Sequence, residues 1–264
     1  MIAPHIDPVA LQLGPIAIHW YGLMYVFAFM SAWKLVQVQL KEQKLWGTVV
    51  DPEKFENLFT WLILGVILGG RIWYVIFYNP SFYIDNPIKV FYVWNGGMSF
   101  HGGFLGTVIM GWLYCKRHNL PFLILLDRFA VVAPLGLAFG RMGNFINGEL
   151  WGRVVANPND VPWAMIFPDA GAYPRHPSQL YELALEGLLL FVILWFTRNK
   201  PWAEGTRISI FLLGYAAARI FCENFREPDA QLGFIFANIT MGMLQSSAMI
   251  IAGLGILFWI KRKT

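Results

Sequence analysis

Long apolar segments, separated by short polar connections, run along the whole chain. Seven of them contain about 20 mostly apolar residues, the length that an α-helix needs to cross the hydrocarbon core of a bilayer. These segments are residues 17–40, 57–78, 99–117, 122–145, 178–198, 207–226 and 237–260. The pattern predicts an all-α, polytopic membrane protein of about seven transmembrane helices. We expect residues 1–264 to form a single integral membrane domain.

The composition supports this interpretation. Hydrophobic residues make up 57% and charged residues 14% of the 264 positions, whereas soluble domains contain about 25% charged residues. The net charge of +4 could indicate nucleic-acid binding. However, the basic residues cluster at the ends of apolar segments and form no basic stripe, so no nucleic-acid partner is expected. Cys115 and Cys222 belong to no disulfide or metal-binding motif, and we expect no metal site.

The Lys and Arg residues of the short connections predict the orientation of the chain. They are more frequent in one set of connections: Lys41, Lys44, Lys116, Arg117, Arg198, Lys200, Arg207, Lys261, Arg262 and Lys263. This bias predicts an outer N-terminus and an inner C-terminus. Two longer segments, residues 79–98 and 146–177, then lie outside. Their turn signals and aromatic residues predict a small outer, periplasmic cap.

Polar residues inside the apolar segments indicate a site. The stretch Gly140–Gly152 follows an apolar run and contains Arg141, Asn144 and Glu149. Ionisable groups at membrane depth are costly and usually face a protein interior or a water-filled cavity. Asp127 and Arg128 also lie near an apolar run, but they fall at the inner boundary, where an anchoring role is sufficient.

Other segments place polar side chains at the same predicted depth. Tyr215, Arg219 and Glu223 are spaced by four residues, which puts them on one helical face. His101 and Tyr21 lie at the outer ends of the third and first segments. This convergence from independent segments predicts one site in the outer half of the membrane.

Each of these residues also has a structural interpretation. Arg219 and Glu223 can form an i,i+4 ion pair that neutralises both charges. Arg141 can extend its guanidinium to the outer headgroups. His101 can be a hydrogen-bonded packing residue. The others can be aromatic packing residues or helix caps: Tyr21, Tyr215, Asn144 and Asn147.

The functional interpretation rests on what arginine and histidine do together. An arginine fork suits bidentate contact with phosphate, and a phospholipid headgroup is the phosphate available at a membrane surface. Arginines can also stabilise the charge that develops as a phosphate leaves. Histidine accepts protons near neutral pH. Together these groups favour a reaction in which a lipid phosphate departs and a deprotonated nucleophile replaces it.

The stretch Gly140–Gly152, GRMGNFINGELWG, resembles the signature of the prolipoprotein diacylglyceryl transferase family. Further motifs resemble those of the family in the same order: HWYGLMY at 19–25, LGGR at 68–71, GGMSFHGG at 96–103, RHPSQLYE at 175–182 and the segment 219–231. The resemblance covers nearly the whole chain.

This resemblance implies a multi-pass enzyme of the bacterial inner, cytoplasmic membrane, with its active site towards the outer leaflet. Such enzymes transfer the diacylglyceryl group of phosphatidylglycerol to the lipobox cysteine of a prolipoprotein signal peptide, as the first step of lipoprotein maturation. A thioether forms and glycerol phosphate is released. The implied partners are phosphatidylglycerol, the signal peptide and membrane lipids, and no cofactor is implied.

The resemblance also assigns roles to individual residues. Arg141 and Arg219 match the arginines implicated in phosphatidylglycerol binding and catalysis, and His101 matches a proposed base. Glu223 is expected to orient a base. The remaining matches are expected to bind substrate: Tyr21, Asn144, Glu149 and Tyr215.

Three other classes remain as alternatives. A lipid or anion transporter or flippase would place charges along a pathway between both leaflets, usually with inverted repeats. An intramembrane serine protease could use Ser99 and His101, but they are only two residues apart and no GxSxG-like turn is present. A purely structural membrane protein gives no reason for so many polar residues at one depth.

Overall fold

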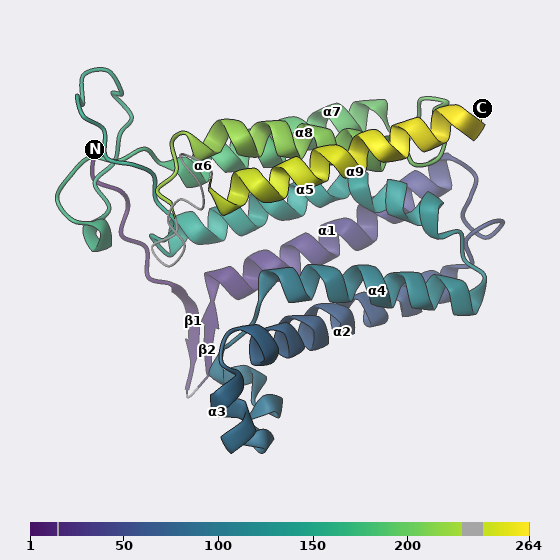
Figure 1. Ribbon diagram of the computed structural model, residues 1–264, viewed down its shortest axis with the longest axis horizontal. Coiled ribbons are helices and arrows are strands. Elements are labelled where there is room, and N and C mark those ends of the chain that lie inside the picture. Colours follow the sequence, from purple (N-terminus) through teal and green to yellow (C-terminus); the bar gives the residue numbers. More distant parts are fainter. Residues whose placement is uncertain (15, 229–239, 264) are drawn as a thin grey trace. The chain divides into compact units, whose positions relative to one another are not determined.

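The computed structural model describes residues 1–14, 16–228 and 240–263, which are mostly helical (Figure 1). Its long single helices are α1 (Trp20–Glu42), α2 (Pro52–Phe77), α4 (Phe100–His118), α5 (Phe122–Ile146), α8 (Thr206–Glu223) and α9 (Met241–Lys263). A further long helix consists of α6 (Ser178–Glu182), the π-helical stretch η4 (Leu183–Leu189) and α7 (Leu190–Thr197). Each of the seven predicted segments therefore contains a helix. Residues 237–239 of the last segment lie outside the described residues.

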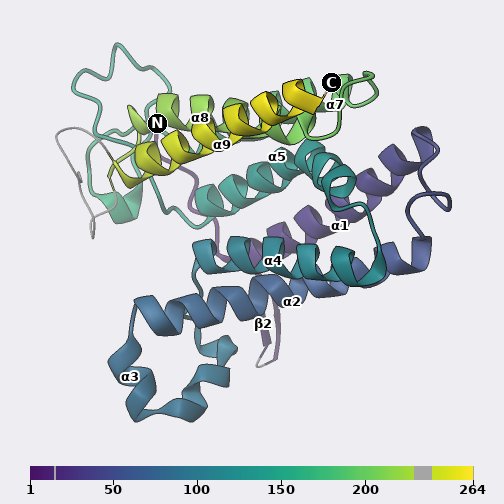
Figure 2. The ribbon, with the colours of Figure 1, turned by 45° about the vertical axis from the view of Figure 1, so that its right-hand side comes forward.

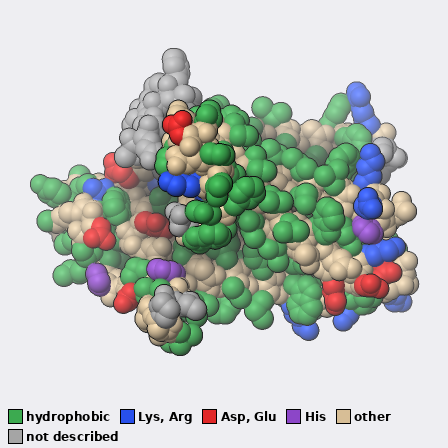
Figure 3. Space-filling model, turned by 90° about the horizontal axis from the view of Figure 1, so that it is seen from below, with side chains coloured by type: hydrophobic (Ala, Val, Ile, Leu, Met, Phe, Trp, Pro, Cys, Tyr) green, Lys and Arg blue, Asp and Glu red, His purple; other side chains and the backbone are tan. Residues whose placement is uncertain are grey.

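Within the described ranges, five helices are long and apolar enough to cross a membrane: α1, α2, α5, the α6–α7 helix and α9. Helices α4 and α8 are not among them. The 18 residues of α8 include Arg207, Arg219 and Glu223, which lower its apolar character. On the face shown in Figure 3, hydrophobic side chains cover most of the visible surface, and most charged side chains lie towards its two ends. These features confirm a mostly helical membrane protein.

Two short strands near the N-terminus correct the all-α prediction. Strands β1 (Val9–Leu13) and β2 (Ile16–His19) pair antiparallel. Residues 17–19, which were predicted to begin the first helix, therefore belong to a strand. The β-branched Ile16 and Ile18 favour extended backbone, and Gly14 has a φ of 59°, a conformation that glycine adopts without steric cost.

The chain divides into two compact units, residues 1–39 with 126–264 and residues 40–125. The single membrane domain stays a prediction. In the unit 40–125, α2 and α4 pack closely along two small-residue pairs, Gly65 and Gly69 on α2 and Gly102 and Gly106 on α4 (Figure 2). A Cβ added to Gly65 would lie 2.7 Å from the Gly106 carbonyl oxygen. Such GxxxG spacing lets membrane helices approach backbone to backbone.

Arg71 of α2 organises the segment that follows this helix. The segment contains α3 (Pro80–Asp85) and the short 3₁₀ helices η1 (Pro87–Phe91) and η2 (Val93–Asn95). The Arg71 guanidinium donates hydrogen bonds to five backbone carbonyls, those of Lys89, Val90, Tyr92, Gly96 and Gly97, at 2.6–3.3 Å. The side chain is 5% exposed. Its charge is therefore satisfied by backbone dipoles of the predicted cap segment 79–98.

In the unit 1–39 with 126–264, α5 packs against α1, and α8 packs against α9 (Figure 1). Phe27 of α1 lies against Phe139 of α5, with ring centroids 6.0 Å apart. On another side of α5, Gly187 of η4 approaches Ala138 so closely that an added Cβ would lie 2.6 Å from the Ala138 Cβ. Gly187 thus brings the π-helical stretch against α5.

The predicted cap segment 146–177 is mostly irregular, with one 3₁₀ turn, η3 (Pro168–Ala170), among its residues. Gly152 joins it to its neighbours: Gly152 N–H donates to the His176 carbonyl at 2.9 Å, and Arg153 N–H donates to the Phe225 carbonyl at 2.8 Å. A Cβ at Gly152 would overlap the His176 and Phe225 carbonyl oxygens. Because Gly152 has no side chain, its backbone can meet those of His176 and Phe225 just beyond the end of α8.

Candidate functional site

Arg141 lies in the last turns of α5, where it faces two buried carboxylates of the α6–α7 helix. Its Nε lies 2.8 Å from Glu182 Oε2, and its Nη2 lies 3.3 Å from Glu186 Oε2. Both glutamates are 0% exposed. The four-residue spacing puts both carboxylates on one side of the helix, and the close packing of Gly187 on Ala138 brings that side to α5.

Arg219 of α8 binds the same pair of glutamates. Its Nη1 lies 2.5 Å from Glu182 Oε1 and 3.6 Å from Glu186 Oε1. Its Nη2 lies 2.5 Å from Glu223 Oε1, one turn further along α8. Two arginines from different helices therefore share one buried pair of carboxylates.

Two further residues contact these groups. Arg226, which follows α8, places its Nη1 3.1 Å from Glu182 Oε1. The Thr240 hydroxyl donates to Glu223 Oε2 at 2.9 Å. We call Arg141, Glu182, Glu186, Arg219, Glu223 and Arg226 the arginine–glutamate cluster.

The charges of the cluster balance, since it contains three arginines and three glutamates. Burying one ion without a partner costs several kcal/mol of folding free energy. Because the six charges pair with one another, all six groups can lie inside the protein. Glu182 has the most partners, because its two oxygens face three guanidinium groups. The arginines are consequently held in fixed positions relative to one another by Glu182.

The cluster keeps some capacity to bind a ligand. No hydrogen bond joins Arg141 Nη1 or Arg219 Nε to another of the described residues, although the other guanidinium nitrogens are engaged. The side chains of Arg141 and Arg219 are 17% and 12% exposed, whereas those of Glu182 and Glu186 are 0% exposed. The arginines are therefore more accessible than the two glutamates that they share.

Comparison with known proteins identifies the protein family of this chain. The model of the family described as prolipoprotein diacylglyceryl transferase matches residues 8–259. The chain belongs to this family. It is 49% identical over 261 residues to a Legionella pneumophila protein, covering 98% of both chains, and 50% identical over 262 residues to a Desulfotalea psychrophila protein, covering 97% of this chain and 94% of the other. A Bordetella parapertussis protein is 48% identical over 260 residues, with 98% and 97% covered.

All three relatives carry the name phosphatidylglycerol--prolipoprotein diacylglyceryl transferase. Membership of the prolipoprotein diacylglyceryl transferase family makes the chain an enzyme of the transferase class. It confirms the resemblance that the sequence motifs indicated.

The structure brings together three of the residues that the motifs selected, Arg141, Arg219 and Glu223. The i,i+4 ion pair between Arg219 and Glu223 is present, but it is one part of a larger cluster. The Arg141 guanidinium is bonded to buried Glu182 and Glu186. Whether it also reaches the headgroups stays open.

Asn144 and Glu149 of the transferase signature lie just beyond Arg141. Asn144 is buried, and its side-chain amide donates to Glu149 Oε1 at 2.8 Å. The Glu149 carbonyl accepts from the Gln179 amide at 2.7 Å, which ties this turn to α6. Asn144 and Glu149 thus fix the end of α5 against the helix that carries the glutamates. The Asn144 amide bonds to a side chain, so it does not cap the helix backbone.

The two predicted tyrosines occupy different surroundings. Tyr21 of α1 packs on α5 at Gly143, where an added Cβ would lie 2.6 Å from the Tyr21 ring. Tyr215 lies one turn before Arg219 in α8 and stacks on Phe211, with centroids 6.0 Å apart. It also lies within the electrostatic field of Glu186, Arg219 and Arg141. Of the two, Tyr215 is the one associated with the cluster.

His101 is the second residue of α4, in the unit 40–125. Its side chain lies outside the described part of the structure. Ser99, the other candidate from this motif, caps α4, since its hydroxyl accepts a hydrogen bond from the Gly102 N–H at 3.4 Å. A role for His101 as the base stays a prediction.

Sequence reasoning missed three residues of the cluster as site residues, namely Glu182, Glu186 and Arg226. Glu182 and Glu186 interrupt the apolar run 178–198, and an ionisable residue inside a membrane segment was the signal that could have found them. The π-helical conformation of η4, which is often associated with functional sites, could not be foreseen from spacing alone.

Asp127 and Arg207 form a second buried group at the opposite end of α5, which corrects the anchoring role expected for the inner boundary. Asp127 is 0% exposed, and it accepts hydrogen bonds from the N–H groups of Gly205 and Ile208, both at 2.9 Å. Arg207 Nη1 lies 3.5 Å from Asp127, and the same guanidinium donates to the carbonyls of Arg198 and Lys200. We call these two residues the Asp127 cluster.

An aromatic group lies where the segment 146–177 meets α6. Trp163 Nε1 donates to the Tyr181 hydroxyl at 2.7 Å, and His176 Nδ1 lies 3.1 Å from the same oxygen. The rings of Tyr181 and Phe225 meet edge to face at 5.6 Å. Burial lowers the pKa of His176, so its imidazole is neutral at pH 7. Such amphipathic rings are typical of a membrane interface.

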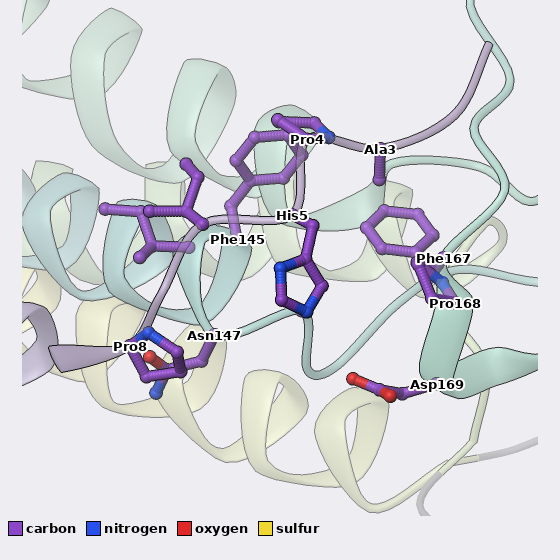
Figure 4. Close-up of a pocket in the computed structure, with 12 residues that line it drawn as sticks. Ala3, Pro4, His5, Pro8, Phe145, Asn147, Phe167, Pro168 and Asp169 are labelled. Carbon is purple, nitrogen blue, oxygen red and sulfur yellow. The ribbon is translucent and has the colours of Figure 1, made fainter.

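A small pocket of about 60 Å³ lies beside the transferase signature, between the N-terminal residues and the segment after α5. Figure 4 shows His5, Asn147 and Asp169 around it. Among the described residues, no group of three or more His, Cys, Asp or Glu side chains could hold a metal ion. The volume of this pocket suits only molecules about the size of water.

Proposed function

We propose that this chain transfers the diacylglyceryl group of phosphatidylglycerol to the thiol of the lipobox cysteine in a prolipoprotein signal peptide. The family membership and the names of the relatives support this reaction. The observation that supports the residue assignment is the sharing of two buried glutamates by Arg141 and Arg219, which leaves donors of both arginines available. Those two arginines bind the phosphate of phosphatidylglycerol.

The proposed reaction is a substitution at carbon. The cysteine sulfur attacks the glycerol carbon of the diacylglyceryl group that carries the phosphate ester. A carbon–sulfur bond forms, the carbon–oxygen bond breaks, and its electron pair stays on the phosphate oxygen. Glycerol phosphate leaves and the thiol proton passes to a base.

The arginines act on the charge that develops during this step. The phosphodiester carries one negative charge, and the departing phosphate monoester gains a second. Guanidinium donors that are already fixed in position stabilise this increase without having to reorganise. Glu182 and Glu186 supply that fixation, because they hold both guanidinium groups from the side buried in the protein.

The base must accept a proton from a thiol, because the thiolate is the competent nucleophile. We propose His101 for this role, or a base oriented by Glu223. Glu223 itself is bonded to Arg219 and Thr240, which suits it to positioning. Tyr21, Asn144, Glu149 and Tyr215 are proposed to shape the substrate site around the arginines.

We also propose seven membrane spans, including α4 and α8, with an outer N-terminus and an inner C-terminus in the bacterial inner membrane. The excess of Lys and Arg in one set of connections supports this orientation. It places the C-terminal end of α5, and hence Arg141, towards the outer leaflet. The segments 79–98 and 146–177 then form the periplasmic cap.

The test uses purified protein, phosphatidylglycerol vesicles and a synthetic lipobox peptide, with thioether formation measured by mass spectrometry. We expect Arg141→Ala and Arg219→Ala each to lower the turnover about 100- to 1,000-fold, as when one preorganised donor is removed from an active site. Arg117→Ala, at an exposed arginine at the end of α4, is the matched control and should be fully active. Full activity in both cluster variants would exclude the phosphate-binding role.

The same vesicles distinguish the transporter alternative. A flippase would move fluorescent phosphatidylglycerol between leaflets without forming a thioether. We expect thioether product and no transfer between leaflets above the protein-free rate. Lipid movement without product would contradict the proposed function.

A further inference from the structure

An apolar groove runs between the α6–α7 helix and α8. One wall consists of Leu185, Leu189 and Ile193, and the other consists of Gly214, Ala218 and Phe221. Its volume is about 390 Å³, within the range of small-molecule sites.

The sequence explains why a groove remains between two packed helices. Gly214 has no side chain and Ala218 has only a methyl group. The two residues lie one helical turn apart on α8, which leaves space between the helices. Leu190 limits its depth, since a Cβ added to Gly214 would lie 2.7 Å from Leu190 Cδ1. The walls are open to the surroundings: Leu189 is 50%, Ile193 46% and Phe221 54% exposed.

The groove adjoins the arginine–glutamate cluster. Leu185 directly precedes Glu186, and Ala218 directly precedes Arg219. Successive residues of a helix lie about 1.5 Å apart along its axis. The groove and the cluster therefore lie at the same level of the α6–α7 helix and of α8.

One end of the groove reaches the aromatic group near the segment 146–177. Phe221 contacts Phe225 at a centroid distance of 5.3 Å, and Phe225 contacts Tyr181. Trp163 and His176 bond the Tyr181 hydroxyl. The groove thus runs from a polar, aromatic boundary into a purely apolar zone, which is the sequence of environments that a phospholipid occupies in a bilayer.

We propose that this groove binds one acyl chain of the phospholipid whose phosphate is held by Arg141 and Arg219. This inference rests on the proposed function and extends it to the lipid tail. The lining offers no polar side chain that could satisfy an extended peptide backbone, and unsatisfied backbone groups are costly in an apolar setting. A helix with its side chains is about 10–12 Å across and does not fit a groove of this volume.

Adjacent alanines of α8 provide a matched test. Ala218 lines the groove, whereas Ala217 is exposed and lies outside it. We expect Ala218→Phe to raise the KM for dipalmitoyl-phosphatidylglycerol roughly tenfold, equivalent to losing the burial of about two methylene groups, with little change in kcat. The KM for dihexanoyl-phosphatidylglycerol should not change. Ala217→Phe should match the unsubstituted protein with both lipids.

The outcomes separate the two proposals. If the unsubstituted protein forms no thioether, the proposed function fails. If it is active and Ala218→Phe behaves like Ala217→Phe, only the groove assignment fails. An equal loss of kcat with both lipids would also overturn the assignment, because it would show a disturbance of the reaction site. Thermal melting in detergent checks that both variants are folded.

Cross-linking identifies the occupant directly. Phosphatidylglycerol with a photoreactive diazirine on one acyl chain should label peptides that contain Leu189 or Phe221 in the active, unsubstituted protein. Labelling should fall in Ala218→Phe and persist in Ala217→Phe. Labelling of the same residues by a diazirine-bearing signal peptide, with none from the lipid, would assign the groove to the peptide and contradict the proposal.

Discussion

The two buried charge clusters at opposite ends of α5 are built on different principles. In the Asp127 cluster, the carboxylate caps the first turn of α8 and the guanidinium binds two loop carbonyls. In the arginine–glutamate cluster, the ion pairs are between side chains. Backbone partners fix a fold, whereas side-chain partners can exchange for a ligand without unfolding the chain.

The two clusters also differ in the exposure of their arginines to the surroundings. Asp127 and Arg207 are 0% and 3% exposed, and Arg207 bonds with the loop between α7 and α8. Arg141 and Arg219 are more exposed than the glutamates beneath them. A charge that is both held by other charges and partly accessible is suited to meet an anion. The Asp127 cluster is therefore structural, whereas the arginine–glutamate cluster is the one that we propose to bind the lipid phosphate.

Among the substitutions that test this comparison, Glu182→Gln is expected to have the largest effect, though a smaller one than Arg141→Ala or Arg219→Ala. A neutral amide can no longer hold three guanidinium groups, so Arg141 and Arg219 lose their fixed orientation. We expect kcat for thioether formation to fall by about 10- to 100-fold, since a displacement of about 1 Å can cost 10²-fold, with a smaller change in KM. The measurement is steady-state kinetics with phosphatidylglycerol and a lipobox peptide.

Glu204→Gln is the control for that variant. Glu204 also pairs with an arginine, Arg128, but it is 42% exposed. Its substitution should leave kcat unchanged. A Glu182→Gln protein with unaltered kcat would contradict the positioning role, whatever its melting temperature.

An intermediate effect, on stability alone, is expected from Asp127→Asn. The amide cannot accept both backbone N–H bonds as a carboxylate does, and Arg207 loses its charged partner. We expect the free energy of unfolding to fall by about 1–3 kcal/mol, the usual result of leaving a buried polar group unsatisfied. Thermal melting in detergent measures the change.

The comparison predicts that kcat per folded molecule is preserved in Asp127→Asn. Asp85→Asn, at an exposed aspartate of α3, should change neither quantity. A loss of kcat in folded Asp127→Asn protein would show that the two clusters do not differ in the way described.

The smallest effect is expected from Arg71→Gln. It tests, in the unit 40–125, whether a buried charge with backbone partners serves only the fold. Among the described residues, the hydrogen-bond partners of the Arg71 guanidinium are five backbone carbonyls, so Arg71 belongs with the structural type. We expect faster amide hydrogen exchange confined to residues 79–98 and a global melting temperature within a few degrees of the original. Unchanged exchange in that segment would show that Arg71 does not organise it.

The sequence predicted the long helices well because each depends mainly on the length of a local apolar run. Residues 122–145 correspond to α5, which spans Phe122–Ile146, and 99–117 correspond to α4. The hairpin of β1 and β2 was missed because two strands of four or five residues leave a weak pattern beside a long helix.

The candidate site was predicted in part. Arg219 and Glu223 lie on one helix, so their four-residue spacing was sufficient to pair them. Glu182 is paired with Arg141 and Arg219 through contacts between helices, and these depend on Gly187 approaching Ala138. Local spacing carries no information on such an approach. The motifs contained Arg141 and, as the last residue of RHPSQLYE, its partner Glu182, but they gave Glu182 no role.

The most direct test is the structure of the active protein with phosphatidylglycerol bound, determined by cryo-electron microscopy. We expect the lipid phosphate within hydrogen-bonding distance of both Arg141 and Arg219, with Glu182 still contacting both guanidinium groups. A phosphate bound elsewhere, with neither arginine contacting it, would contradict the central claim.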